Sequence, residues 1–467
     1  MKMLIMKKFN VVFFYLLAGT VFFSGYSQTP SLGTRGKYYI VDYSPSGQSG
    51  ELQIPVTYTL WVPAGVKTIR GVIVHQHGAG TSASKAGAAA AYDLHWQALA
   101  RKWDCALLGP SYHVLNEGTE IGPGEAELWY DPRRGSDKVF CNALVALGEK
   151  AGHPEIGSAP WCLWGHSGGA QWISQMTVMH PDRVVGAWIR SGGTTKFHSR
   201  HPEWPDPELT EAVYSVPIIA NAGVREKGSA QFNGSWIGMM ATFEEYRPHG
   251  APVGMAPDPV TSHNCGDSRY LAIPFFDACL AMRLPAKGAK TQALKPVDMS
   301  TAWLADEFGD AAVPAAEYKG DIKKSVWLPN ATVARAWMEY VKTGTVGDLT
   351  PPPAPFDVKV EEIPNKGNEI SWSADADLES GIGGLIIMRD GKDLTRLPTV
   401  VQNGSARQAF QGISFHDTPE IPVPAMRYLD TSSHAGEKHT YTVVTLNGAE
   451  VHSKPSDPAT VQKGHAY

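Results

Sequence analysis

Five residues about a third of the way along the chain, Gly165-His166-Ser167-Gly168-Gly169, have the spacing G-x-S-x-G and directly follow the apolar run Ala159–Trp164. A buried strand that ends in this pattern and opens into a helix presents its serine on a sharp, strained turn. The residues around such a turn must carry almost no side chain, which explains the glycines. The pattern therefore predicts that the Ser167 hydroxyl stands above the edge of a sheet as a nucleophile, with the Gly168 amide directed at a developing oxyanion.

A serine nucleophile needs a base, because free serine reacts poorly at neutral pH. His263 is the candidate base among sixteen histidines. It follows the last predicted strand and the turn Pro257–Pro259, and it precedes the helical run Tyr270–Arg283. This position predicts a loop at the carboxyl edge of the sheet, whereas the alternative is a histidine in a surface loop.

Glu226 is the candidate acid that holds the base in its correct tautomer. It follows the buried strand Val216–Ala220 and lies just beyond Gly223, where a turn can direct a carboxylate back toward His263. Asp206, in a proline-rich loop ahead of that strand, is the main alternative. Alternatively, Glu226 is a solvated surface charge within Arg225-Glu226-Lys227 and has no catalytic role.

An oxyanion hole needs two donors, and Gly168 is expected to supply one of them. The loop His77-Gly78-Ala79-Gly80 follows an earlier predicted strand and consists mostly of small residues, so its backbone can approach a substrate closely. Ala79 is the expected second donor, with Gly78 or Gly80 as alternatives.

These motifs occur in the chain order nucleophile, acid and base, and residues 36–283 resemble the α/β-hydrolase family. The resemblance implies an acyl-enzyme mechanism on ester substrates, with Ser167 as nucleophile, His263 as base and Glu226 as orienting acid. The glutamate departs from the aspartate that is more usual at the acid position. Tyr112, Trp129 and His166 are the candidate substrate-binding residues, with packing as the equal alternative.

Strand and helix patterns alternate over the first half of the chain, which favours a mostly parallel sheet with helices on both faces. A short segment between the strands at 184–189 and 216–220 argues against a large lid. The expected strands are Lys37–Tyr43, Gln53–Val62, Gly71–His75, Cys105–Gly109, Trp161–Trp164, Val184–Ile189, Val216–Ala220 and Val253–Ala256, and the expected helices are Ala91–Trp103, Asp137–Lys150 and Gln171–Met179.

The domain boundaries follow from composition. Residues 1–27 are expected to be a signal peptide, residues 28–283 the catalytic domain and residues 284–349 an extension packed on it. Residues 350–355, Thr-Pro-Pro-Pro-Ala-Pro, form a stiff linker. Residues 356–467 are expected to form an all-β sandwich, because short strands alternate with turns such as Asp390-Gly391. Ile370-Ser371-Trp372 and Tyr441-Thr442-Val443 resemble strands of a fibronectin type III module, for which a spacer role is favoured over polymer binding.

The first residues combine a basic start, at Lys2, Lys7 and Lys8, with the apolar stretch Val11–Phe23 and small residues at Gly25 and Ser27. This predicts a secretory leader and a secreted or periplasmic protein, with a transmembrane anchor as the alternative. No other segment has membrane-spanning character, so an integral membrane protein is not expected.

Composition excludes some partners. The net charge is −5 and no basic patch stands out, so nucleic acid is not an expected partner. The five cysteines have no metal-binding spacing, their odd number requires at least one unpaired thiol within a single chain, and no metal or cofactor is expected. The sequence assigns no oligomeric state.

The sequence thus predicts a secreted serine esterase acting on carbohydrate-linked or polymeric esters, with polysaccharide as a candidate partner. An α/β-hydrolase-fold peptidase and a binding protein with a vestigial hydrolase site are the alternatives.

Overall fold

The computed structural model describes residues 35–113, 128–193, 206, 208–289, 293–399, 407 and 409–461, apart from residues 47 and 49. The expected leader, residues 1–27, lies outside the described residues. Within them, no helix combines the length and the apolar character that a membrane span requires.

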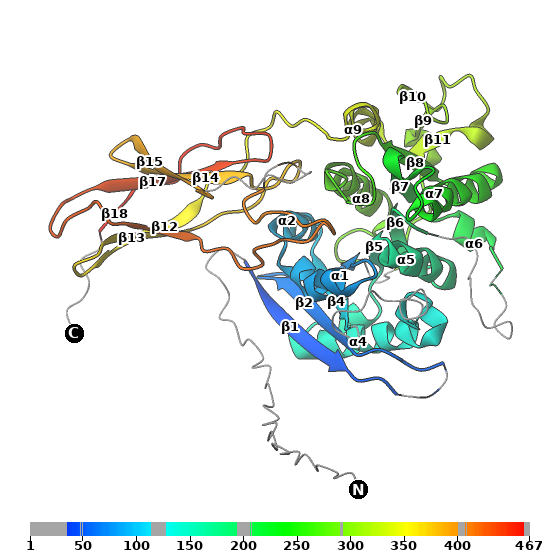
Figure 1. Ribbon diagram of the computed structural model, residues 1–467, viewed down its shortest axis with the longest axis horizontal. Coiled ribbons are helices and arrows are strands. Elements are labelled where there is room, and N and C mark those ends of the chain that lie inside the picture. Colours follow the sequence, from blue (N-terminus) through cyan, green and yellow to red (C-terminus); the bar gives the residue numbers. More distant parts are fainter. Residues whose placement is uncertain are drawn as a thin grey trace, which may run out of the picture.

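An eight-stranded sheet forms the centre of the larger unit, and its strand order is β1-β2-β4-β3-β5-β6-β7-β8 (Figure 1). The pairs β1–β2 and β2–β4 are antiparallel, and every pair from β4 to β8 is parallel. The strands are β1 (Gly36–Tyr43), β2 (Val56–Pro63), β3 (Gly71–Gln76), β4 (Cys105–Tyr112), β5 (Trp161–His166), β6 (Val184–Arg190), β7 (Ile218–Gly223) and β8 (Val253–Asp258).

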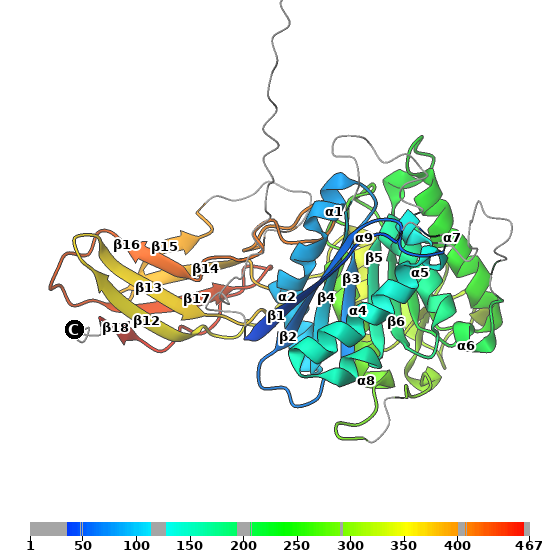
Figure 2. The ribbon, with the colours of Figure 1, turned by 90° about the horizontal axis from the view of Figure 1, so that it is seen from below.

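Helices cover both faces of this sheet, which explains why all six residues of the central strand β5 are buried. On one face α8 packs against α2 and α9, and α4, α5 and α7 lie on the other (Figures 1 and 2). The α-helices are α1 (Thr81–Gly87), α2 (Leu94–Lys102), α4 (Ser136–Ala151), α5 (Gly168–Met179), α6 (Glu211–Tyr214), α7 (Asn233–Tyr246), α8 (Arg269–Arg283) and α9 (Ala331–Thr343). The 3₁₀ turns are η1 (Ala88–Tyr92), η2 (Pro132–Arg134), η3 (Pro154–Gly157), η4 (Val224–Glu226), η5 (Arg247–His249), η6 (Met299–Thr301) and η7 (Ile322–Lys324).

This arrangement confirms the predicted fold class. A mostly parallel sheet with helices on both faces, and a strand–serine–helix turn after β5, is the α/β-hydrolase fold. The loops that follow β3, β5, β7 and β8 all leave the carboxyl edge of the sheet, because these strands are parallel. The catalytic candidates Ala79, Ser167, Glu226 and His263 lie on these loops or the turns next to them.

The segment from residue 293 to 349 packs on this unit. Its small sheet, β10-β9-β11, consists of β9 (Trp303–Ala305), β10 (Ala312–Pro314) and β11 (Val326–Leu328). Helix α9 buries Trp337 and Tyr340 in the main core, where Trp337 donates through Nε1 to the Met255 carbonyl at 2.8 Å. Tyr340 donates to Asp258 Oδ2, also at 2.8 Å, which ties α9 to the end of β8.

The C-terminal region contains two antiparallel sheets with a shared apolar core that includes Ile370, Trp372, Leu385 and Val443 (Figure 2). Strand β13 alternates buried and half-buried residues, the pattern of a sheet with one face on the core. One sheet is β12-β13-β16 and the other is β15-β14-β17-β18. The strands are β12 (Phe356–Ile363), β13 (Gly367–Ser373), β14 (Gly384–Arg389), β15 (Lys392–Leu397), β16 (Arg427–Asp430), β17 (Thr440–Leu446) and β18 (Ala459–Thr460).

Candidate active site

Ser167 occupies the strained turn between β5 and α5. Its backbone angles are φ 55° and ψ −116°, a conformation that a residue with a side chain rarely adopts. Gly165 and Gly169 have no room for a side chain, because backbone atoms lie too close to them. A Cβ on Gly169 would lie 2.5 Å from the carbonyl oxygens of Gln76 and His77, and a Cβ on Gly165 would lie 2.5 Å from the carbonyl oxygen of Gly169. The turn therefore depends on glycine at these two positions.

The structure brings Ser167, His263 and Glu226 into one hydrogen-bonded series. The Ser167 hydroxyl donates to His263 Nε2 at 2.9 Å, and His263 Nδ1 donates to Glu226 Oε1 at 2.5 Å. Glu226 is fully buried, and its other oxygen accepts from the Ser191 hydroxyl at 2.9 Å and the Gly223 amide at 3.0 Å. The carboxylate is thus held in place while it orients the imidazole, which is the arrangement that allows a histidine to accept a serine proton.

The alternative acid, Asp206, and a further aspartate near the His263 loop, Asp258, both lie outside this series. Asp206 is exposed and lies ahead of α6 in the chain. Asp258 accepts from the amides of Val260 and Thr261 and from the Tyr340 hydroxyl, so its carboxylate organises the turn after β8.

The two expected oxyanion donors lie side by side. A Cβ built on Gly168 would be 3.0 Å from the Ala79 amide nitrogen, which shows how closely the loop after β3 approaches the start of α5. Gly168 is the first residue of α5, where a backbone N–H has no partner within the helix. Two amides at this point can bind one oxyanion.

His77 orients the peptide that carries the Ala79 amide. Its Nε2 accepts from the Tyr112 amide at 3.0 Å, so Nδ1 carries the proton and donates to the Gly78 carbonyl at 2.5 Å. In a trans peptide the N–H points opposite to the C=O, so the Ala79 N–H is directed away from His77. Burial lowers the pKa of His77 to about 3, so the ring stays neutral at physiological pH. This geometry favours Ala79 as the second donor.

The three expected substrate-binding side chains, Tyr112, Trp129 and His166, are buried beneath the catalytic residues. Tyr112 and Trp129 are each 1% exposed and His166 is fully buried. The Tyr112 and Trp129 rings stack at 4.8 Å, and the Tyr112 hydroxyl bonds that of Tyr58 at 2.9 Å. These side chains pack within the site, with the Trp129 ring next to Gly168, and a substrate-binding role for them stays a prediction.

Three residues that the sequence did not single out hold the His263 loop. Fully buried Arg190, at the end of β6, donates to Thr261 Oγ1 at 2.8 Å and to the carbonyls of Ser262 and Asn264. The Phe232 ring stacks on the His263 imidazole at 4.0 Å with an interplanar angle of 8°. The third residue, His416, comes from the C-terminal region.

His416 completes a series of hydrogen bonds that reaches the catalytic histidine. His166 Nε2 donates to the His263 carbonyl at 2.7 Å, so Nδ1 of the neutral His166 ring is an acceptor. His416 Nδ1 lies 3.3 Å from it and donates, which leaves His416 Nε2 to accept from Ser82 Oγ at 3.4 Å. Burial lowers the pKa of His166 well below its usual range and that of His416 to about 4, so both rings are neutral at physiological pH.

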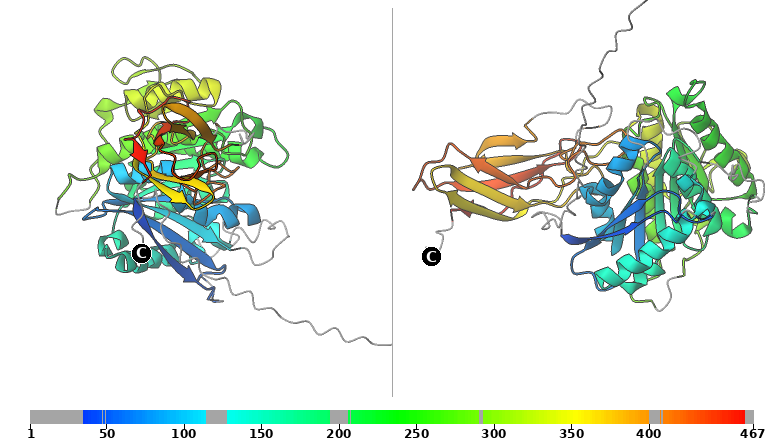
Figure 3. Two further views of the ribbon diagram at one scale, coloured as in Figure 1. Left: turned by 90° about the vertical axis from the view of Figure 1, so that its left-hand side faces the viewer. Right: turned by 60° about the horizontal axis from the view of Figure 1, so that its bottom comes forward.

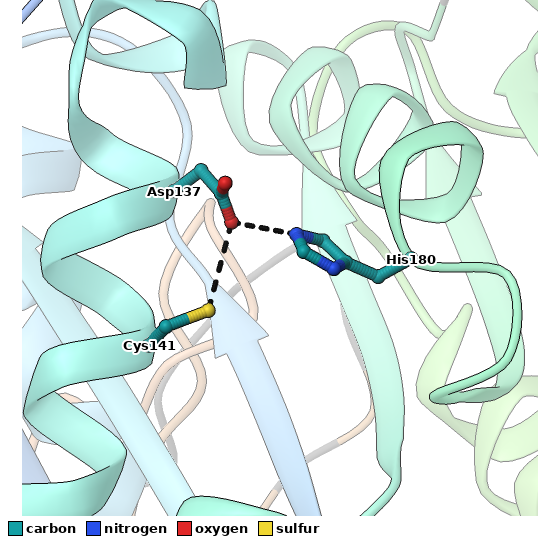
Figure 4. Close-up of side chains that lie close together, drawn as sticks. All are labelled: Asp137, Cys141 and His180. Atoms are coloured by element: carbon teal, nitrogen blue, oxygen red, sulfur yellow. Dashed lines mark hydrogen bonds and ion pairs between the residues drawn. The ribbon is translucent and has the colours of Figure 1, made fainter.

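One cluster with metal-ligand chemistry lies in the described residues. Asp137 and Cys141 on α4 and His180 after α5 place one ligand atom each within 4.8 Å of one another (Figure 4). His180 Nε2 donates to Asp137 Oδ1 at 2.7 Å, and burial, followed by the charge of Asp137, raises the pKa of the Cys141 thiol to about 12. A protonated thiol and an engaged carboxylate make this cluster a link between α4 and α5. All five cysteines are free thiols.

The sequence matches no protein-family profile and no curated protein. Similar solved structures include an S-formylglutathione hydrolase from Agrobacterium tumefaciens (13% identity, 54% of this chain, 96% of that chain, TM-score 0.37) and the feruloyl esterase module from Clostridium thermocellum (14%, 54%, 89%, 0.35). A thermostable esterase is also similar (15%, TM-score 0.32), with 47% of this chain matching 54% of that chain. At these identities and scores, the likeness does not define a function for this chain.

Proposed function

We propose that this protein is a serine hydrolase that cleaves carboxylic esters through an acyl-enzyme. The observation that carries the proposal is the Ser167–His263–Glu226 series, with hydrogen bonds of 2.9 and 2.5 Å, beside the paired amides of Ala79 and Gly168. A nucleophile, a base, an orienting acid and two oxyanion donors are together the parts that acyl transfer requires.

The reaction follows from the geometry. His263 Nε2 takes the Ser167 proton as the serine oxygen attacks the ester carbonyl, and the amides of Ala79 and Gly168 bind the oxyanion. His263 then gives that proton to the leaving alkoxide, which departs as an alcohol and leaves an acyl-Ser167 ester. Water, deprotonated by His263, attacks this ester, and the collapse of the second oxyanion releases the acid and restores the serine proton.

The substrate class and location are proposed from the sequence. An exported enzyme with an appended β-sandwich suits an ester attached to a carbohydrate or contained in a polymer, and the N-terminal pattern of Lys2, Lys7, Lys8 and Val11–Phe23 supports secretion or a periplasmic location. We also propose a fibronectin type III-like sandwich, because Trp372 is buried in its core and the Tyr441 hydroxyl donates to Asp430 Oδ2 at 2.8 Å.

Hydrolysis of p-nitrophenyl acetate tests the activity. Ser167→Ala should lower kcat by about 10⁴-fold or more, because loss of a triad nucleophile removes the covalent path. Ser215→Ala, at an exposed serine after α6, is the matched control and should keep full activity. Undiminished hydrolysis by Ser167→Ala would contradict the proposal. Acetylated glycans, feruloylated glycans and polyesters then serve to identify the substrate class.

A further inference from the structure

Within the connection between β15 and β16, residues 409–426 leave the sandwich and lie against the hydrolase unit (Figures 1 and 3). Two contacts show this. The Gln411 side chain accepts from the Leu94 amide and donates to the Tyr92 carbonyl, each at 2.9 Å, and the Cys265 amide donates to the Phe415 carbonyl at 3.0 Å. Leu94, on α2, in turn packs in the apolar core of the sandwich. The two units therefore share one packed interface.

A buried ion pair anchors this connection next to the active site. Asp417 is fully buried, and its Oδ1 accepts from Arg269 Nε at 2.7 Å. Its Oδ2 accepts from His75 Nε2 at 3.2 Å and from Trp96 Nε1 at 3.3 Å. Burial alone would raise the pKa of Asp417, but the Arg269 guanidinium and the His75 hydrogen bond hold that pKa below its usual range. Such a carboxylate fixes the backbone on either side of it.

Phe415 projects from this anchored backbone and stays 50% exposed. Its ring centroid lies 6.0 Å from that of His166 and 6.4 Å from that of His263. Phe232, which is half-buried, stacks on a face of the same imidazole. Phe415 therefore presents an exposed apolar ring beside the catalytic histidine, on backbone that a buried ion pair holds in place.

The chemistry assigns this side of the site to the leaving group. A general acid must be within hydrogen-bond reach of the atom that it protonates, so the alcohol oxygen of the ester lies at His263 Nε2. The group attached to that oxygen extends along the His263 side, whereas the carbonyl oxygen lies at Ala79 and Gly168. We propose that Phe415, supplied by the C-terminal sandwich, forms a leaving-group subsite for alcohols with an apolar ring face, such as an aryl alcohol or the C–H face of a sugar. This inference rests on the proposed ester hydrolysis.

The test compares two acetate esters that differ only in the alcohol, benzyl acetate and methyl acetate. Phe415→Ala should raise KM for benzyl acetate by about tenfold, the effect expected for one aromatic contact, with kcat nearly unchanged. Methyl acetate has no ring to contact Phe415, so its KM should change by less than about twofold. Phe415→Tyr keeps the ring face and should behave like the wild type.

Ile421→Ala is the matched control, because Ile421 is 42% exposed on the same connection and should leave both KM values unchanged. Thermal unfolding of each variant shows whether the fold is kept. Equal losses on both esters, or no change on either, would contradict a leaving-group subsite at Phe415. The proposed function is tested separately, by whether the wild type hydrolyses either ester and whether Ser167→Ala abolishes that hydrolysis.

Discussion

Asp417 and Arg269, 148 residues apart in the sequence, form a buried ion pair with a Nε–Oδ1 distance of 2.7 Å. Arg269 begins α8 of the hydrolase unit, and Asp417 belongs to the connection between two strands of the sandwich. The same guanidinium donates to Asp93 Oδ2 at 2.8 Å, and Asp93 caps the N-terminus of α2. One cation thus joins two helices of the hydrolase unit to the sandwich, so the two units are held together by a buried ion pair.

Asp417→Ala should destabilise the whole protein. The substitution leaves a buried arginine with one of its two carboxylate partners, a change that typically costs about 3 kcal/mol. Differential scanning calorimetry should show one transition for both units in the wild type and a lower transition temperature in the variant. Asp457→Ala, at an exposed aspartate of the sandwich, is the control. An unchanged transition temperature in Asp417→Ala would show that the ion pair does not hold the interface.

His416→Gln should lower kcat for a small ester about fivefold, the factor that corresponds to a lost hydrogen bond of about 1 kcal/mol. The amide nitrogen of glutamine reaches the position of Nε2 rather than Nδ1, so the bond to His166 is lost. Asparagine places its amide nitrogen near the Nδ1 position and should retain most of the activity. Steady-state kinetics of His416→Gln and His416→Asn measures this difference in kcat. Equal kcat values in the two variants would count against a positioning role for His416.

Stability should fall as the pH falls from about 6.5 to 4. Burial lowers the pKa of His77 to about 3 and that of His416 to about 4, so over this range the unfolded chain binds protons that the folded protein does not. Urea unfolding at several pH values in this range measures the slope of the free energy of unfolding against pH. The slope should be shallower in His416→Asn, whereas His434→Asn, at an exposed histidine, should match the wild type. A wild-type stability independent of pH would contradict the neutral buried rings.

Glu226→Gln should lower kcat for p-nitrophenyl acetate by about 10³-fold or more, because an amide cannot stabilise the imidazolium or hold the required histidine tautomer. Asp206→Asn provides the comparison at the alternative acid and should leave kcat unchanged. If Asp206→Asn lowered kcat and Glu226→Gln did not, Glu226 would not be the acid of the triad.

Local patterns predicted the fold class and placed the main catalytic candidates. Ser167 and Gly168 lie in a five-residue motif, and His263 and Glu226 follow strands whose carboxyl ends meet at one edge of a parallel sheet. Helix α1 was not expected, because Thr81–Gly87 has no apolar stripe. Similarly, β7 extends to Gly223 rather than ending near Ala220.

The contacts of Phe415, His416 and Asp417 had no local signature in the sequence. They lie in a connection between two sandwich strands, and their partners His166, His263 and Arg269 belong to a different unit of the chain. The sequence also left the roles of Tyr112 and Trp129 open between substrate binding and packing. Aromatic residues near a catalytic edge look alike in sequence whether they face a ligand or stack on each other, as these two do.

Covalent labelling with a fluorophosphonate probe tests whether Ser167 is an activated nucleophile. Such a probe reacts with a serine only where a base activates it and an oxyanion hole accepts the phosphoryl oxygen. We expect one equivalent of label on the wild type, located by peptide mass spectrometry on Ser167, and no label on Ser167→Ala. A folded wild type that stays unlabelled, or that carries the label on another serine, would contradict it.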